Sequence, residues 1–424
     1  MEYLVSIERE GKQVLVGTIG GEDSGAARFS YVEKYLNDPD AAAISIHLPL
    51  QKEAFSPADT KLYFEGLLPE GFTRRSVAQW MHLDENDYLS ILHGLGRECL
   101  GAVRVSAPED RPEEAYESVS AEQVQALAAE GATRSAEMVT KAHLSLTGAS
   151  GKVGLYFDSK SEKWFLPKGT APSTHIVKQS HVRLDGIVTN EQLSLLTASG
   201  CGIEIPESFI INTGNGEDSE ILFATRRYDR VFPDQARRVD DLPCPYRLHQ
   251  EDFSQALGIP ASEKYERESG QYMKKMFDLL RVRSADPVKD QLRLWDCIVF
   301  SYLIGNTDAH IKNYSLLYSP DLKKIRLAPA YDIISTTVYE ASTREMSFHI
   351  GGRYLIEEID REAFREAAGA AGLGEKMAMR RFDAMYGNFR EKLRSAAETL
   401  EKEGYRNARD MEERILRTGG YGRL

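Results

Sequence analysis

The chain has 424 residues, more than one hydrophobic core usually serves, so we expect two or three packed units. Hydrophobic residues make up 42% and charged residues 28%, the balance of an ordinary globular protein. The net charge of −12 argues against a general nucleic-acid binder, because phosphate contacts need clustered Lys and Arg. Contact with DNA through a basic partner is not excluded by this charge.

The four cysteines lie far apart and form no CxxC pair, which predicts reduced thiols and no cysteine metal site. The first residues lack the basic and apolar regions of a signal peptide. An apolar run at 297–304 predicts a buried helix and is far shorter than the ~20 residues of a membrane span. We therefore expect a cytoplasmic protein that does not enter the membrane.

The amino-terminal part opens with short β-rich segments and continues with helices. Residues 4–7 and 13–17 flank a polar turn and predict a hairpin. Residues 43–48 alternate between apolar and polar side chains, as a half-buried strand does. Helical segments are expected around residues 63–68 and 88–92.

The middle of the chain begins with a charged, proline-bearing stretch at 107–114, which predicts a linker or an exposed loop. Ser120 and Gln123 predict a capping box that opens a short helix. Further strands are expected at 153–157, 163–166, 174–178, 209–211 and 221–224, the first two forming a hairpin, with a helix near 190–198.

From Gln250 onward the pattern is nearly all helical. It ends in a run rich in Lys, Arg and Glu at 361–417, followed at 418–422 by what we expect to be a mobile tail. Strands, one helix and further strands before this region match the small lobe of a protein kinase. The sequence thus predicts an α+β, two-lobed, kinase-like fold.

The segment Gly305–Asn313 carries residues typical of phosphoryl transfer. Asp308 and Asn313 have the Asp–four residues–Asn spacing of a kinase catalytic loop. Asp332 follows 19 residues later, where a kinase has its second metal-binding Asp, although the usual Phe-Gly is missing. Such pairs are also common in turns, so this spacing alone is weak evidence. The apolar run before Asp308 strengthens it, since a carboxylate buried there needs a reason.

A lysine and an acid lie upstream in kinase order. Lys178 falls on an expected strand, and Glu191 follows 13 residues later at the start of the next helix. Taken singly, an edge-strand lysine and a first-turn helix acid explain them better. Together with Asp308, Asn313 and Asp332, they favour a kinase, in which the lysine contacts ATP phosphates and pairs with the acid.

A glycine-rich loop, Leu146–Gly154, precedes one expected strand. It is not a Walker A loop, because only two residues separate Gly148 from Gly151, and Val153 stands where Ser or Thr is required. Its backbone N–H groups can still bind phosphate oxygens, and a flexible hairpin loop is the alternative. For His310, binding a phosphate and bonding a backbone carbonyl are both open.

Twelve segments follow one another in an order that is typical of one protein family. They are Ile46–Leu50, Phe64–Glu70, Gly96–Val103, Ser145–Ala149, Pro167–Gly169, Thr174–Lys178, Asn190–Glu191, Arg227–Arg230, His249–Phe253, Lys264–Glu266, Gly305–Asn313 and Tyr331–Ile333. With them, nearly the whole chain resembles the bacterial HipA family, the toxin kinases of two-gene toxin–antitoxin modules.

The resemblance implies a kinase-like fold with an extra amino-terminal subdomain. Residues 1–106 would form that subdomain as part of a β-rich N-lobe, and 107–135 a linker with a short helix. Residues 136–230 would form the N-lobe core with the ATP loop and hinge. Residues 231–424 would form an all-helical C-lobe with the catalytic and metal-binding loops.

The resemblance also implies a role for each site residue. Asp308 would be the catalytic base, with Asn313 and Asp332 as magnesium ligands. Glu191 would pair with Lys178. Autophosphorylation of Ser145 would switch the kinase off, with Thr147 and Ser150 as alternative acceptors. ATP would be bound by Thr147, Gly148, Ala149, Ser150, Gly151, Lys152, Lys178, Arg226, Arg227, Tyr228, His310, Ile311, Lys312, Asn313, Tyr331 and Asp332.

In function, the resemblance implies a serine/threonine protein kinase that uses ATP and Mg²⁺ and arrests growth. Its target would be a protein such as an aminoacyl-tRNA synthetase. Its partner would be a small helix-turn-helix antitoxin, HipB-like, through which it could contact DNA. Ser150 stands where the family's loop commonly has Gln, and Arg226 stands where its hinge often has an acid. Both differences leave the affinity for the nucleotide open. A non-catalytic subunit of an antitoxin–DNA repressor complex and a small-molecule or lipid kinase are the alternatives.

Overall fold

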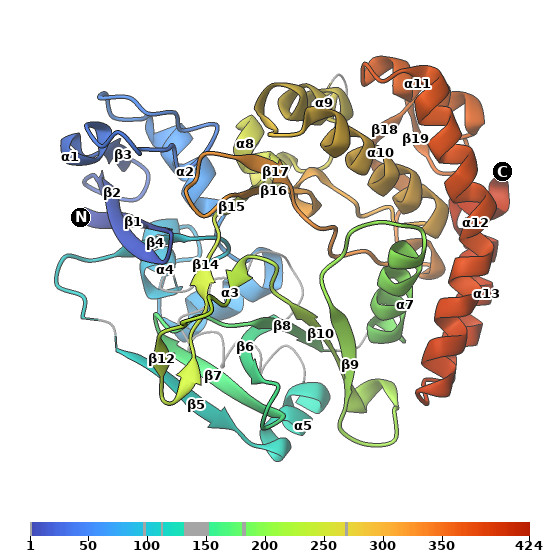
Figure 1. The fold of residues 1–424 in the computed structure, drawn as a ribbon, viewed down its shortest axis with the longest axis horizontal. Coiled ribbons are helices and arrows are strands. Elements are labelled where there is room, and N and C mark those ends of the chain that lie inside the picture. The colour runs from blue at the N-terminus through green and yellow to red at the C-terminus, as the bar shows by residue number, and fades with distance from the viewer. Residues whose placement is uncertain (1, 96–98, 112, 131–151, 180–183, 268–269) are drawn as a thin grey trace. The chain divides into compact units, whose positions relative to one another are not determined.

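The computed structural model describes residues 2–95, 99–111, 113–130, 152–179, 184–267 and 270–424. Its contacts divide the chain into two units, whose helices and strands are labelled in Figure 1. Unit 1 holds Met1–Gln179, Ala224–Ala261 and Leu317–Lys324, and unit 2 holds Ser180–Phe223, Ser262–Leu316 and Ile325–Leu424. The four segments expected from the sequence remain a proposal for the domain organisation.

Unit 1 begins with an antiparallel sheet in the order β3-β2-β1-β4. The elements here are β1 (Glu2–Arg9), β2 (Lys12–Gly20), β3 (Arg28–Tyr31), α1 (Glu33–Leu36), α2 (Pro57–Glu65), α3 (Gly71–Trp80), α4 (Tyr88–Leu95) and β4 (Val103–Ser106). The β1–β2 turn has positive φ at Glu10 and Gly11, as a two-residue hairpin turn requires. The predicted hairpin is confirmed, and the predicted helical segment 88–92 lies in α4. Only residues 63–65 of the predicted helical segment 63–68 lie in α2, and 66–68 form a turn.

Five strands of the six-stranded second sheet, in the order β5-β7-β6-β8-β10, lie wholly or partly in unit 1. The elements of this part are β5 (Glu114–Val119), α5 (Ala121–Glu130), β6 (Lys152–Asp158), β7 (Lys163–Gly169), β8 (His175–Gln179) and β10 (Ile221–Arg226). Pairing of Asp158 with Lys163 confirms the predicted β6–β7 hairpin. Ser120 and Gln123 exchange the two hydrogen bonds of a capping box, as predicted. The linker or exposed loop expected at 107–114 is confirmed as a loop over its described residues up to Glu113, and Glu114 begins β5, which pairs with β7.

The rest of unit 1 consists of short elements. They are β11 (Arg230–Val231), β12 (Arg238–Val239), β13 (Leu242–Pro243), β14 (Tyr246–Arg247), β15 (Gln250–Asp252), α8 (Phe253–Leu257) and the end of β16 (Ser315–Tyr318). Strand β11 pairs with β14, β12 with β13, and β15 with β16. These pairings bring distant parts of the sequence into one unit.

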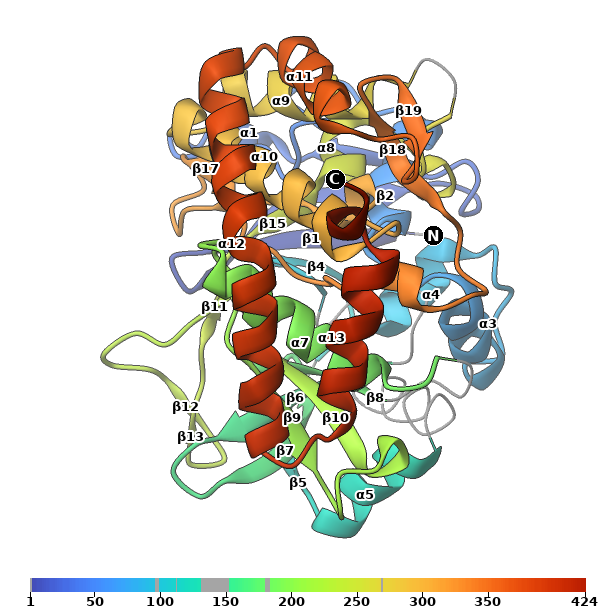
Figure 2. The ribbon, with the colours of Figure 1, turned by 90° about the vertical axis from the view of Figure 1, so that its right-hand side faces the viewer.

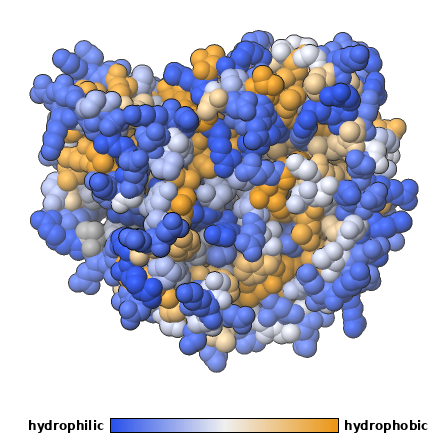
Figure 3. Space-filling view, in the orientation of Figure 1, coloured by the Kyte–Doolittle hydropathy of each residue, from blue (hydrophilic) through white to orange (hydrophobic). Residues whose placement is uncertain are grey.

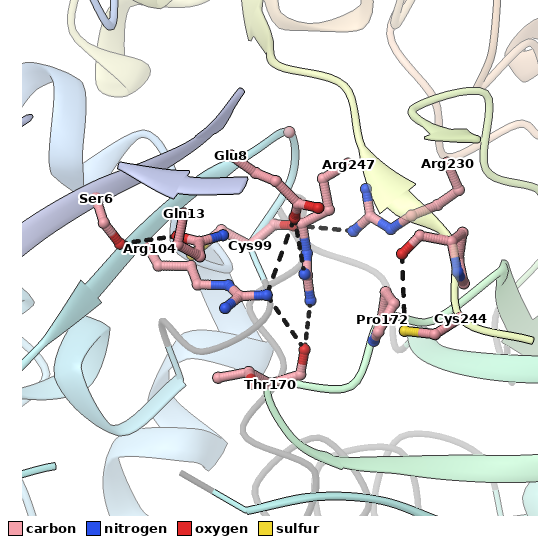
Figure 4. Close-up of polar contacts among 12 residues, drawn as sticks. Ser6, Glu8, Gln13, Cys99, Arg104, Thr170, Pro172, Arg230, Cys244 and Arg247 are labelled. Atoms are coloured by element: carbon pink, nitrogen blue, oxygen red, sulfur yellow. Dashed lines mark hydrogen bonds and ion pairs between the residues drawn. The ribbon is translucent and has the colours of Figure 1, made fainter. Parts of the chain in front are cut away.

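A buried polar cluster joins the two sheets of unit 1 (Figure 4). Glu8 of β1 lies 3.3 Å from the guanidinium of Arg247 and 4.0 Å from that of Arg104. Both guanidinium groups also donate to the carbonyl oxygen of Thr170, at 2.9 and 3.4 Å. Buried ion pairs of this kind are costly to break, because the partner left behind keeps an uncompensated charge. The cluster therefore connects the amino-terminal sheet to the end of β7, in the sheet whose strand β8 carries Lys178.

Residues 43–48, expected as a half-buried strand, form no strand. Two of their backbone N–H groups bond to distant side chains instead. The N–H of Ile44 donates to the Tyr31 hydroxyl, and the N–H of Ile46 to Glu251 Oε1, both at 3.0 Å. The strand prediction is wrong, because the apolar alternation comes from a loop that is buried by tertiary contacts.

Unit 2 contains most of the long helices. Its elements are α7 (Ile187–Gly200), β9 (Ser208–Asn212), α9 (Tyr272–Arg283), α10 (Pro287–Ile304), β17 (Ile325–Leu327), β18 (Glu345–Ile350), β19 (Arg353–Leu355), α11 (Arg361–Ala370), α12 (Glu375–Lys402) and α13 (Asn407–Thr418). The predicted helix near 190–198 and strand at 209–211 are confirmed as α7 and β9. Helices α12 and α13 run side by side in Figure 2. Arg409 of α13 pairs with Glu398 and Glu401 of α12, each at 3.2 Å.

Two expectations about the later part of the chain are wrong. The region after Gln250 contains strands β15 to β19 as well as helices, because runs of three to six residues are too short to show a period. The α+β class is confirmed, but the carboxyl-terminal part is not all helical. The expected mobile tail forms the 3₁₀ helix η5 (Gly420–Arg423), in which the Tyr421 ring stacks on Phe389 with centroids 5.1 Å apart.

The part of the chain that the structure describes has no helix that is both long enough and apolar enough to cross a membrane. Hydrophilic residues cover most of the face drawn in Figure 3, and apolar residues show between them in patches.

Candidate active site

Helix α10 delivers the predicted catalytic loop. It begins after Asp286, whose carboxylate accepts the N–H of Lys289 at 3.2 Å, with a proline at its first position. It ends at Gly305, whose φ is +77° and where a Cβ would come within 2.1 Å of Thr337 Oγ1. Glycine suits this left-handed C-terminal cap, so the chain leaves the helix three residues before Asp308.

The loop lies where the sequence placed it, but its carboxylate is not buried. Trp295 and Phe300 of α10 are fully buried and belong to the core of unit 2. Asn306 and Thr307 are also buried, whereas Asp308 is exposed. The expectation of a carboxylate buried by the apolar run is therefore wrong. The Asp308 carboxylate is therefore accessible from solvent.

Hydrogen bonds within the loop hold Asp308 and Asn313 together. The N–H of Asp308 donates to Asn306 Oδ1 at 3.1 Å. Its carbonyl oxygen accepts the N–H of His310 at 2.8 Å and the side-chain Nδ2 of Asn313 at 2.9 Å. Because the donor end of the Asn313 amide is bound in this way, its oxygen is the end that can take a cation. Residues Ile311–Asn313 form the 3₁₀ helix η3.

Asp332 is held close to this loop by the residue before it. The Tyr331 hydroxyl donates to the carbonyl oxygen of Lys312 at 3.1 Å and lies 2.6 Å from Ser315 Oγ. These two partners flank Asn313, so Tyr331 joins the two predicted metal-binding residues. Asp332 has a φ of +57°, a left-handed conformation that is uncommon outside glycine. Such backbone strain concentrates at functional sites.

Two further contacts connect the site to other elements of unit 2. Ser347 Oγ of β18 donates to the carbonyl oxygen of Thr307 at 2.7 Å. Asn190 of α7 exchanges two hydrogen bonds of 2.9 Å with the backbone of Ser335 in the segment after Asp332. Helix α7 thereby supports that segment while carrying Glu191, which is buried.

Tyr265 contacts the predicted catalytic carboxylate directly. Its hydroxyl donates to Asp308 Oδ1 at 2.6 Å, and its ring meets the His310 ring edge-on with centroids 5.3 Å apart. Sequence reasoning gave Tyr265 no role, although Lys264–Glu266 was among the segments that carried the resemblance. Asn190 and Ser347 were likewise not predicted as site residues, because no local pattern shows which carbonyl a distant side chain will reach.

The remaining predicted residues of the described chain lie in unit 1. Lys178 sits on β8, directly across from Lys152 on β6. His175, on the same strand as Lys178, is buried, and burial together with the charge of Arg226 lowers its pKa to about 4. The structure thus gathers the predicted site residues into two groups, with Glu191 and the catalytic loop in unit 2.

The predicted hinge, Arg226–Tyr228, follows β10. The Arg227 guanidinium is buried and bonds Asp229 at 3.0 and 2.8 Å and Ser173 Oγ at 3.0 Å. Burial alone would raise the pKa of Asp229, but Arg227 and Arg230 outweigh it and lower that pKa to about 2. Since this guanidinium supports the fold of unit 1, a nucleotide contact by Arg227 would have to come from its backbone.

The predicted loop residues Thr147–Gly151 and the predicted phosphoacceptor Ser145 lie outside the described residues. Within the described residues, no cluster of three or more His, Cys, Asp or Glu side chains could hold a metal ion. Mg²⁺ at kinase sites takes only one or two carboxylates, together with substrate phosphates and water. The side-chain oxygens of Asn313, which is bonded to Asp308, and of Asp332, which follows Tyr331 in the sequence, fit that requirement.

Comparisons with known proteins place the chain in a family. A model described as the HipA-like C-terminal domain matches residues 144–397, and one described as the HipA N-terminal domain matches residues 11–106. The chain belongs to the HipA family. A Sinorhizobium fredii protein named "Putative kinase Y4mE" is 32% identical over 380 residues, 87% of this chain and 86% of that protein.

Other HipA relatives extend the comparison to a named toxin and to a solved structure. The serine/threonine-protein kinase toxin HipA of Shewanella oneidensis is 26% identical over 326 residues, 74% of this chain and 71% of that protein. A solved complex of Shewanella oneidensis HipA with HipB and operator DNA contains a chain that matches with a TM-score of 0.77. That match covers 97% of both chains at 18% identity, and it confirms the HipA-like, kinase-like fold.

Proposed function

We propose that this HipA-family chain is an ATP- and Mg²⁺-dependent serine/threonine protein kinase of the toxin type. The observation that carries the proposal is the hydrogen-bonded group of Asp308, Asn313 and Tyr331, the residue before Asp332. Asn313 Nδ2 bonds the Asp308 carbonyl, and Tyr331 joins the Asp332 segment to both sides of Asn313. One accessible carboxylate beside two oxygen ligands is what phosphoryl transfer requires of a protein.

In this proposal, Asp308 orients the acceptor hydroxyl and receives its proton. The acceptor oxygen forms a bond to the γ-phosphorus, the bond from that phosphorus to the β–γ bridging oxygen breaks, and ADP leaves. Asn313 and Asp332 would hold Mg²⁺, which when bound neutralises charge on the phosphate oxygens. The chain's own contribution is to fix the carboxylate and the amide in position before ATP arrives.

Unit 1 would supply the contacts to the nucleotide. Lys178 would contact the phosphates and pair with Glu191, and the loop from Thr147 to Lys152 would cover them. The backbone of the hinge would meet adenine. Autophosphorylation of Ser145 would switch the kinase off. These roles rest on the family resemblance and on the strand position of Lys178.

The partners follow from the same resemblance. We propose that a small HipB-like helix-turn-helix antitoxin neutralises the chain and connects it to DNA, as the composition of the Shewanella complex suggests. The net charge of −12 suits a basic, DNA-bound partner. The target would be a protein such as an aminoacyl-tRNA synthetase, whose phosphorylation arrests growth.

Radiolabelled ATP tests the activity. The purified chain with Mg²⁺ and [γ-³²P]ATP should label itself, and Asp308→Asn should lower the rate by roughly 10²- to 10⁴-fold. Asp410→Asn changes an exposed carboxylate on α13 and serves as the matched control, with labelling at the wild-type rate. Equal labelling by Asp308→Asn and wild type would show that the assignment is wrong.

Melting curves separate a kinase from a non-catalytic subunit. ATP with Mg²⁺ should raise the melting temperature of the wild type and of Asp308→Asn, because a ligand that binds only the folded state stabilises it. An unchanged melting temperature at saturating ATP and Mg²⁺, with no labelling, would favour a kinase-like scaffold that binds antitoxin without catalysis.

A further inference from the structure

Tyr265 bonds the carboxylate that we propose as the catalytic base. Its hydroxyl donates to Asp308 Oδ1 at 2.6 Å, within the range of strong charge-assisted O–H···O⁻ bonds. Its ring lies edge-on to His310 at 77°. Tyr265 is 43% exposed and Asp308 is exposed, so the bond forms at a surface that a protein substrate can reach.

One residue of β18 holds both partners of this bond in place. The N–H of Glu266, next to Tyr265, donates to the carbonyl oxygen of Ser347 at 2.7 Å. The hydroxyl of Ser347 in turn donates to the carbonyl oxygen of Thr307, next to Asp308, at 2.7 Å. The distance between Tyr265 and Asp308 is therefore set by a common anchor.

The Glu266 side chain restrains the same segment from a second direction. Its carboxylate is fully buried and accepts the N–H of Tyr272 at the start of α9 and the N–H of His349 in β18, both at 2.8 Å. The residue next to Tyr265 is thus bound at three points, once through its backbone and twice through its carboxylate, which leaves the phenol little freedom to move away. This favours a permanent part of the site over a removable cover.

We propose that Tyr265 is a positioning residue for phosphoryl transfer, an inference that rests on the proposed kinase activity. With Oδ1 held by the phenol, the plane of the Asp308 carboxylate is fixed, and so is the direction in which Oδ2 meets the acceptor hydroxyl. A carboxylate has lone pairs on both oxygens, so the phenol and the acceptor can be bound together. Tyr265 acts through Asp308 and touches neither nucleotide nor acceptor.

The test removes only the hydroxyl. Tyr265→Phe keeps the ring against His310, and kcat for transfer from [γ-³²P]ATP to the chain and to casein should fall by about 10- to 100-fold. The KM for ATP should stay within about twofold, because uniform binding is untouched. Tyr265→Ala should match Tyr265→Phe, since the hydroxyl and not the ring carries the effect. Both variants should keep the wild-type melting temperature.

Tyr35→Phe is the matched control. It removes a tyrosine hydroxyl of unit 1 that donates to the carbonyl oxygen of Ala42 at 2.8 Å and has no role in the proposed site, so kcat should remain at the wild-type value. A wild-type rate for Tyr265→Phe would overturn the positioning role. A faster rate would also overturn it, because the phenol would then compete with the acceptor for Asp308. Phosphate found on Tyr265 by mass spectrometry would overturn it by making Tyr265 an acceptor.

The two proposals fail in different ways. A wild-type chain that transfers no phosphate removes the kinase activity and the role of Tyr265 together. An active wild type and an inactive Asp308→Asn, beside an unaffected Tyr265→Phe, remove only the role of Tyr265.

Discussion

Glu251 of β15 provides a quantitative test of the electrostatics of unit 1. Its oxygens accept the Ser45 hydroxyl at 2.6 Å, the Ile46 N–H at 3.0 Å and the Tyr318 hydroxyl. The residue is only 2% exposed. Burial raises the pKa of Glu251 from 4.5 to about 7, although the three hydrogen bonds lower it and the nearby Asp252 adds to the rise.

The sign of the pH dependence follows from this pKa. An acid whose pKa is higher in the folded than in the unfolded state binds a proton on folding, which stabilises the folded chain fully below pH 4.5. That stabilisation declines as the pH rises from 4.5 and is lost above about 7. At about 1.4 kcal/mol for each pH unit, the loss amounts to about 3 kcal/mol.

Glu251→Gln removes the titration while it keeps the size and a carbonyl acceptor. The free energy of unfolding of the wild type minus that of the variant should fall by about 3 kcal/mol between pH 4.5 and pH 8. Urea unfolding of both full chains across this range, followed by tryptophan fluorescence, measures the difference.

Other groups titrate in the same pH range, so their contributions to stability must cancel when the wild type is compared with the variant. Burial lowers the pKa of His175 and of His249 to about 4, so both groups make stability rise as the pH increases toward 6.5. They do so in wild type and variant alike, and the difference between the two proteins isolates Glu251. A difference that stays constant within about 1 kcal/mol across the range would refute the reasoning.

Three further substitutions test contacts of the fold and the site. Asp229→Ala leaves two buried arginines without the carboxylate they share, and urea unfolding should show a loss of about 3–5 kcal/mol; an unchanged midpoint would contradict the buried pairing. Asn190→Ala removes two hydrogen bonds to the Ser335 backbone, so the free energy of unfolding should fall by about 2–3 kcal/mol and phosphate transfer should be slower. An undiminished transfer rate would show that α7 does not support the site. Gly305→Ala forces a Cβ against Thr337 Oγ1 at positive φ, so thermal melts should show a loss of about 1–3 kcal/mol in the free energy of unfolding. An unchanged melting temperature would contradict the role of Gly305 as the C-terminal cap of α10.

Local signals in the sequence were reliable where neighbours along the chain decide the structure. The β1–β2 and β6–β7 hairpins, the capping box of α5 and the buried helix α10 all depend on residues a few positions apart. The strand prediction for residues 43–48 was wrong because residues distant in the sequence decide the structure there. Two of their N–H groups are satisfied by Tyr31 and Glu251, and no pattern within the segment encodes those partners.

The predictions for the carboxyl-terminal tail and for the short strands were wrong for the same reason. Glycine-rich chain ends usually lack tertiary contacts, but the Tyr421 ring packs against Phe389 and Tyr386 on α12. Strands as short as β17 are defined by the partner to which they pair and not by their own composition. Both outcomes depend on contacts between residues that are distant in the sequence.

The sequence by itself determined the order of the site residues, the place of Asp308 at the end of an apolar helix, and the family. Spacing and helix-ending residues act locally, so they can be read without a fold. Only the tertiary structure decided that Asp308 is exposed, that Tyr331 joins Asp332 to the loop, and that Tyr265 bonds the carboxylate. Those contacts connect residues 19 to 43 positions apart, where chain geometry sets no distance and only packing does.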